Sequence, residues 1–234
     1  METNKENSVR IQTSLLNGVE KKALLFLAQR QSGWMTSNIL TFIGFIGSVL
    51  IATGYLLSTK NINYIWLSSL GFIVNWYGDS LDGTLARVRN RQRPVFGYYL
   101  DHTMDVVCEL IMFLGLGFSG LIQFEVSVLI LVLYLMLTLN VSINAHLKNE
   151  FRLTYAKLGP TEFRVLGIIA NTIVIYVDSI LLPLVDLNIL NRHIELSMLD
   201  IIGIVILFIL ILIYSVTVIK DLRDYSIMDP VKEK

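Results

Sequence analysis

Six apolar runs, each long enough to cross a lipid bilayer as a helix, constrain this chain more than any other feature. A bilayer core takes about 20 residues of helix, and inside it a single chain satisfies its backbone polar groups only as helices or a closed barrel. The composition agrees, since 54% of the 234 residues are hydrophobic and only 16% are charged. We therefore predict an all-α integral membrane protein with six transmembrane helices, at residues 35–58, 64–87, 96–119, 122–147, 160–183 and 197–219.

The segment just before the first run differs from the six runs because it has two faces. In a helix over residues 15–31, five apolar side chains lie near one face and three charged side chains lie on the other. The apolar set is Leu16, Val19, Ala23, Leu24 and Leu27, and the charged set is Glu20, Lys21 and Lys22. We predict an amphipathic interfacial helix on the membrane surface, with a short soluble cap as the alternative.

The distribution of Lys and Arg predicts the orientation of the spans. With six spans, both termini share a side with the loops after the second and fourth spans, and that side holds seventeen of the 19 basic residues. Because basic residues concentrate in cytoplasmic loops, we predict that both termini are cytoplasmic, in the cell membrane of a prokaryote or the endoplasmic reticulum of a eukaryote. The single membrane domain, 1–234, then comprises an N-terminal cytoplasmic segment (1–34), the six-helix core (35–219) and a cytoplasmic tail (220–234).

Charge and cysteine content exclude several classes of function. The formal net charge is zero, which argues against a general nucleic-acid-binding protein. The three His are scattered and Cys108 is the single cysteine, so the chain has neither a disulfide framework nor a Cys/His zinc site.

Four aspartates interrupt the second and third apolar runs. Asp79 and Asp82 share a helical face with the small residues that follow them, and Asp101 and Asp105 are spaced by four residues in the next run. The connection between the two runs is short, so we expect antiparallel neighbouring helices whose acidic faces converge. Ionisable side chains at membrane depth are costly and are functional candidates by default.

These carboxylates predict a metal site. Four acids in close pairs repel one another unless a cation lies among them, and ligands that are all oxygen favour hard cations such as Mg²⁺ or Mn²⁺. Four carboxylates are enough for two ions, which together can bind the entering and leaving oxygens of a phosphoryl centre. Arg87 is placed to bind phosphate oxygens, and Gly83 and Ala86 leave room for a group against the helix backbone.

The pattern resembles the signature of the CDP-alcohol phosphotransferase family. The matching positions are Asp79, Asp82, Gly83, Ala86, Arg87, Gly97, Asp101 and Asp105, with nine residues between Arg87 and Gly97. A second segment, residues 36–41, looks like the Thr-Pro-Asn-x-x-Thr entry to the family's first span, except that Ser37 replaces the proline.

The resemblance implies a reaction and a set of roles. Such enzymes transfer a substituted phosphate from a CDP-linked donor to an alcohol acceptor in phospholipid biosynthesis, with release of CMP, and commonly form homodimers. By resemblance, the metal ligands are Asp79, Asp82, Asp101 and Asp105, and the donor-binding residues are Gly83, Ala86, Arg87, Gly97, Asn38 and Thr41. Asp105 is also the implied general base, although metal ligation lowers the basicity of a carboxylate.

The sequence leaves the acceptor open. Arg164, with Lys148 nearby in the sequence, would suit an acceptor alcohol that carries its own phosphate, and this implies a CDP-diacylglycerol donor, which we slightly favour. The pair Thr161-Glu162 instead looks similar to the branch that transfers CDP-ethanolamine or CDP-choline to diacylglycerol. Glu109, one turn beyond Asp105, is expected to tune the site or pair with a polar neighbour.

Two other classes of function compete with an enzyme. Intramembrane acids also mark ion paths, which would make the chain a cation transporter, but the acids crowd one leaflet and no relay leads to the other side. A catalytically silent membrane scaffold is the third class, and it is disfavoured because every residue of the signature is present.

Overall fold

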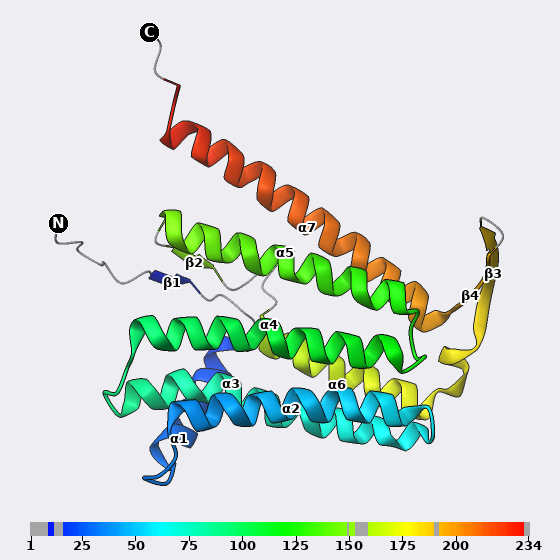
Figure 1. Ribbon diagram of the computed structural model, residues 1–234, viewed down its shortest axis with the longest axis horizontal. Coiled ribbons are helices and arrows are strands. Elements are labelled where there is room, and N and C mark those ends of the chain that lie inside the picture. The colour runs from blue at the N-terminus through cyan, green and yellow to red at the C-terminus, as the bar shows by residue number, and fades with distance from the viewer. Residues whose placement is uncertain (1–8, 12–15, 149, 153–158, 190–191, 232–234) are drawn as a thin grey trace.

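The computed structural model describes residues 9–11, 16–148, 150–152, 159–189 and 192–231. These residues are mostly helical, and the long helices run side by side with alternating direction (Figure 1). Within the described ranges there are seven α-helices: α1 (Asn17–Gln29), α2 (Ser37–Ser58), α3 (Ile65–Val88), α4 (Pro94–Phe118), α5 (Phe124–Lys148), α6 (Pro160–Tyr176) and α7 (Met198–Met228).

Three of the helices that the structure describes are both long enough and apolar enough to cross a membrane by composition alone. They are α2, α5 and α7. The other long helices carry the polar residues of the bundle: α3 and α4 contain the four aspartates, and α6, with 17 residues, contains Arg164. Each of these three helices begins within two residues of an expected span.

The described residues are mostly helical, but the prediction of an all-α protein is wrong in two regions. α6 ends at Tyr176 instead of reaching residue 183, and a 3₁₀ turn (Asp178–Leu181) follows it. The chain then forms an antiparallel hairpin, β3 (Pro183–Ile189) with β4 (Arg192–Ser197). Pro183 fits the start of the hairpin, because proline disfavours helical backbone in the residue before it, and Leu182 is extended with φ −71° and ψ 142°. A second small sheet pairs β1 (Val9–Ile11) in parallel with β2 (Glu150–Arg152).

Helix α1 packs against the helical bundle. Its buried residues Leu24 and Ala28 join a cluster that includes Leu81 and Leu85 of α3. Val19, from the expected apolar face, lies away from this cluster and is 72% exposed. Glu20, expected on the charged face, instead contacts the protein: its carboxylate accepts a hydrogen bond from Trp76 Nε1 of α3 at 3.1 Å.

Close contact between α2 and α3 forms the centre of the bundle. At Gly47 of α2 and Gly78 of α3, an added Cβ would overlap backbone atoms of the facing helix. Small residues let helix backbones approach in this way inside membranes. Polar groups bridge the same interface, since Ser68 Oγ donates to the Ile51 carbonyl at 2.8 Å and Asn75 Nδ2 donates to the Gly44 carbonyl at 2.9 Å.

This contact predicts that Gly47→Ala destabilises the protein. The methyl group would meet the backbone of Asn75, and overpacking of this kind costs about 1–3 kcal/mol. Thermal unfolding in detergent should show a lower midpoint for Gly47→Ala than for the parent. Gly18→Ala is the matched control, because a Cβ at Gly18 in α1 meets no atom within 4 Å. An unchanged midpoint for Gly47→Ala would contradict the described approach of the two helices.

Candidate metal and phosphate site

The two acid-bearing helices are joined by a short turn. α3 ends at Val88 and α4 begins at Pro94, where proline suits the first helical position because it has no N–H to leave unpaired. Asn90 in the turn has φ 51°, a left-handed conformation that asparagine tolerates. Arg89 anchors the turn by donating to the carbonyls of Gln31 and Ser32 at 2.9 and 2.8 Å.

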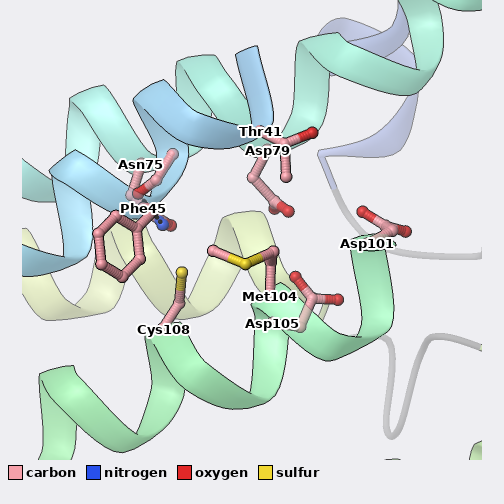
Figure 2. A pocket seen from close by; sticks show the side chains of 9 residues that line it. Thr41, Phe45, Asn75, Asp79, Asp101, Met104, Asp105 and Cys108 are labelled. Carbon is pink, nitrogen blue, oxygen red and sulfur yellow. Dashed lines mark hydrogen bonds between the residues drawn. The ribbon is translucent and has the colours of Figure 1, made fainter. Parts of the chain in front are cut away.

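α3 and α4 are antiparallel, as expected (Figure 1), although each packs more closely against other helices than against the other. α2 packs against both of them, and α4 also packs against α5. The acidic faces still converge, because the acids of α3 and α4 point toward one another across the edge of α2 (Figure 2).

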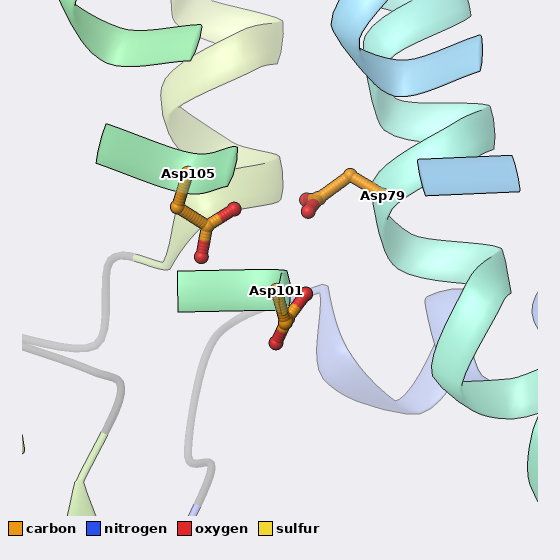
Figure 3. A group of neighbouring side chains, drawn as sticks. All are labelled: Asp79, Asp101 and Asp105. Atoms are coloured by element: carbon orange, nitrogen blue, oxygen red, sulfur yellow. The ribbon is translucent and has the colours of Figure 1, made fainter. Parts of the chain in front are cut away.

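Three of the four predicted metal ligands come together. One carboxylate oxygen from each of Asp79, Asp101 and Asp105 lies within 4.8 Å of the other two (Figure 3). Two oxygens on one Mg²⁺ at about 2.1 Å can be at most about 4.2 Å apart, so small side-chain rotations would bring all three into contact with one ion. The donor set contains only oxygen, which fits Mg²⁺ or Mn²⁺.

The fourth aspartate faces a different helix. Asp82 is 7% exposed, and its carboxylate accepts a hydrogen bond from Thr41 Oγ1 of α2 at 2.6 Å. Ser37 Oγ donates to the Asp82 carbonyl at 3.0 Å. Asp82 therefore joins α3 to the first turns of α2, outside the three-acid cluster. Its predicted role as a metal ligand stays a prediction.

Arg164 of α6 lies against the cluster. Its Nη2 donates to Asp79 Oδ2 at 2.5 Å, and its Nε donates to Asn75 Oδ1 at 2.7 Å. Asn75 is one turn before Asp79 on α3, and its amide nitrogen also donates to Ser48 Oγ at 3.0 Å. Asn75 thus links α2, α3 and α6 directly beside the acids.

A small pocket opens among α2, α3 and α4 next to these groups (Figure 2). Two of the three clustered acids face it from α4 and the third faces it from α3. Its lining residues are Thr41, Gly44, Phe45, Asn75, Asp79, Asp101, Met104, Asp105 and Cys108. At about 10 Å³ the pocket has room for about one water molecule or ion, so it marks the space that the acids share and is too small to hold a substrate.

The predicted donor-binding residues lie in the first turns of α2, the last turns of α3 and the first turn of α4. Thr41 lines the pocket, and Asn38 is exposed in the first turn of α2. Arg87 is exposed and donates to Thr84 Oγ1 at 3.0 Å. Gly97 leaves open space where a side chain would be. The remaining two, Gly83 and Ala86, are partly buried on α3.

Only one of the predicted acceptor-binding residues with a described side chain reaches the acidic cluster. Arg164 reaches the cluster, whereas Glu162 caps the start of α6: its carboxylate accepts from the Gly159 N–H at 2.9 Å and the Leu16 N–H at 2.8 Å. Lys148 is the last residue of α5, and its side chain lies outside the described part of the structure.

Sequence reasoning did not identify Asn75 or the pairing of Arg164 with Asp79. Asn75 could have been found, because it lies four residues before Asp79 and so shares its helical face. The Arg164–Asp79 pair could not, because the two residues are 85 positions apart and no local spacing connects them.

Comparisons with known proteins agree with the site. The family model described as CDP-alcohol phosphatidyltransferase matches residues 34–187, more than half of the chain, and this range contains all four aspartates and Arg164. The chain is also similar to archaetidylinositol phosphate synthase of Pyrococcus horikoshii, with 32% identity over 97 residues. That match covers 42% of this chain and about half of the relative, 48% of its length. The chain therefore belongs to the CDP-alcohol phosphatidyltransferase family.

Proposed function

We propose that this protein transfers a substituted phosphate from a CDP-linked lipid, of the CDP-diacylglycerol type, to a polar alcohol and releases CMP. The observation that carries the proposal is the cluster of Asp79, Asp101 and Asp105, with one oxygen from each within 4.8 Å of the others. Family membership supports an enzyme over the cation transporter and the scaffold.

The residues around the cluster suit the separate tasks of this reaction. Divalent ions held by the acids would neutralise the diphosphate of the donor. Asp105 would accept the proton of the attacking hydroxyl, since it faces the pocket and is the second of the two clustered acids along α4 from the turn. Arg87 would bind phosphate oxygens of the donor. Asp82 would complete a second metal position after leaving Thr41.

Two observations favour a polar acceptor that carries its own phosphate. The similar protein is named as a synthase of archaetidylinositol phosphate. Arg164 also brings a guanidinium to the edge of the acidic cluster, and guanidinium groups bind phosphate through paired N–H donors. The acceptor would be an alcohol phosphate of this general kind.

The alternative, transfer from CDP-ethanolamine or CDP-choline to diacylglycerol, rests on Thr161 and Glu162. Both side chains already have protein partners. Thr161 Oγ1 donates to the Glu20 carboxylate, and Glu162 caps α6. These bonds account for the pair as a structural contact between α1 and α6, so this alternative has less support.

The proposed setting is a six-span membrane protein with both termini in the cytoplasm, working as a homodimer. Three described helices qualify as spans by composition, and α3, α4 and α6 lie alongside them (Figure 1). Asp79 lies eight residues, about 12 Å of helix, before Arg87. This depth would place the acids inside the cytoplasmic leaflet, where a lipid and a water-soluble phosphate can both arrive.

Removal of the proposed base should stop the reaction. In detergent or vesicles with Mn²⁺, the parent should release CMP from CDP-diacylglycerol and an alcohol phosphate, and Asp105→Asn should lower kcat by about 10²–10⁴-fold. EDTA should abolish release by the parent, and added Mn²⁺ or Mg²⁺ should restore it.

Asp186→Asn is the matched control, because Asp186 is exposed on β3, away from the acids. Its CMP release should equal that of the parent. Failure of the parent with every donor and acceptor would overturn the enzyme proposal and leave the scaffold.

The acceptor class can be separated by a donor-by-acceptor panel. The acceptors are glycerol 3-phosphate, inositol 1-phosphate, inositol, serine and diacylglycerol, with labelled product as the readout. We expect product from a phosphorylated acceptor, and we expect Arg164→Lys to raise its KM about tenfold or more, because Lys cannot form the planar fork. Product from diacylglycerol and CDP-ethanolamine alone would favour the alternative.

A further inference from the structure

One terminal nitrogen of the Arg164 guanidinium has no hydrogen-bond partner. Nε and Nη2 donate to Asn75 and Asp79, but Nη1 is buried and makes no hydrogen bond. The Arg164 side chain is only 13% exposed. A buried N–H group without an acceptor carries a free-energy cost, so another acceptor within reach of this nitrogen would stabilise it.

Glu109 has a buried acceptor atom that could match this donor. Its carboxylate oxygen Oε2 makes no hydrogen bond. Glu109 lies one turn beyond Asp105 on α4, about 6 Å along the helix, and interacts electrostatically with Arg164 and Asp79. Tyr134 of α5 interacts electrostatically with the same charged groups. The unpaired donor and the unpaired acceptor therefore lie in one buried cluster without being bonded to each other.

A divalent ion on the Asp79 carboxylate would weaken its bond to Arg164, because the ion draws on the same negative charge. Oδ2 of Asp79 is bonded to Nη2 of Arg164, while the three-acid cluster includes Asp79. A guanidinium in that position would also repel a bound dication. Metal binding and the Arg164–Asp79 bond therefore compete for one carboxylate.

We propose that Glu109 is a positioning residue that accepts the Arg164 guanidinium when Asp79 turns toward a divalent ion. The inference rests on the proposed function for its metal. Pairing with Glu109 satisfies both unpaired atoms and keeps Arg164 beside the cluster, with donors available to an acceptor phosphate. Metal binding and acceptor recognition are then linked through one arginine that changes partners between α3 and α4.

The test is a double-mutant cycle in which Mn²⁺ binding is measured without substrates. The full chain in detergent is titrated with Mn²⁺, and free Mn²⁺ is counted by electron paramagnetic resonance for the parent, Glu109→Gln, Arg164→Gln and the double variant. Arg164→Gln should tighten Mn²⁺ binding about tenfold by removing the competing cation. Glu109→Gln should weaken binding about three- to tenfold in the parent, and less than about twofold when Arg164 is already replaced.

Glu125→Gln, on an exposed side chain in the first turn of α5, removes the same charge away from the cluster and should leave Mn²⁺ affinity unchanged. Equal weakening by Glu109→Gln in both backgrounds would show that Glu109 acts only as a charge, and would overturn the inference. Weaker Mn²⁺ binding by Arg164→Gln would overturn it too. No Mn²⁺ binding by the parent would contradict the proposed metal-dependent function itself.

If Arg164→Gln is not recovered as folded protein, Arg164→Lys takes its place in the cycle. Lys keeps the positive charge but cannot bond two acceptors in a fixed plane. The coupling between positions 109 and 164 should then be smaller than with arginine, and coupling of the same size would overturn the inference.

Discussion

Repulsion among carboxylates held together in a low-dielectric bundle is the constraint on which the rest of the structure depends. Asp79, Asp101 and Asp105 approach within a few ångströms of one another, and like charges at such distances interact far more strongly in a protein interior than in water. The buried guanidinium of Arg164 on α6 offsets part of this repulsion through its ion pair with Asp79. Packing of α6 against α3 and the electrostatics of the cluster therefore support each other.

The polar residues beside the acids are also the residues that hold the helices together. Asn75 donates to α2 and accepts from α6. Thr41 of α2 donates to Asp82 of α3. Polar contacts between helices add stability inside a membrane, because an unsatisfied polar group there cannot form hydrogen bonds with water. Because the same bonds position the site, substitutions in α2 should change the geometry of the acidic cluster even when they leave every aspartate in place.

The N-terminal helix extends this arrangement to the edge of the bundle. Glu20 of α1 accepts from Trp76 and Thr161, and so ties α1 to both α3 and α6. Glu162 accepts from the backbone at Leu16 and at Gly159. α1 thus packs over the start of α6, which carries Arg164, and over the later turns of α3, which carry Asp79 and Asp82. Its exposed apolar residues, Val19 and Phe26 among them, face away from the protein.

The linear chain by itself determined the helices and the chemistry of the acids. Runs of apolar residues and the spacing of Asp79, Asp82, Asp101 and Asp105 depend only on local periodicity, so the predicted spans agree closely with α2, α3, α4 and α5. The order in which helices pack is not local. Only the tertiary structure packed α2 against both α3 and α4, turned Asp82 toward Thr41 and brought Arg164 to Asp79.

The same distinction explains the region after α6. Helical and extended conformations compete there on a short apolar stretch, and Pro183 favours the extended state at Leu182, where the hairpin begins. Periodicity cannot separate these states over so few residues. Thus local pattern determined which residues form helices and which could bind metal, whereas contacts between distant segments decided which carboxylates share a site and which cation balances them, because such contacts depend on packing in three dimensions.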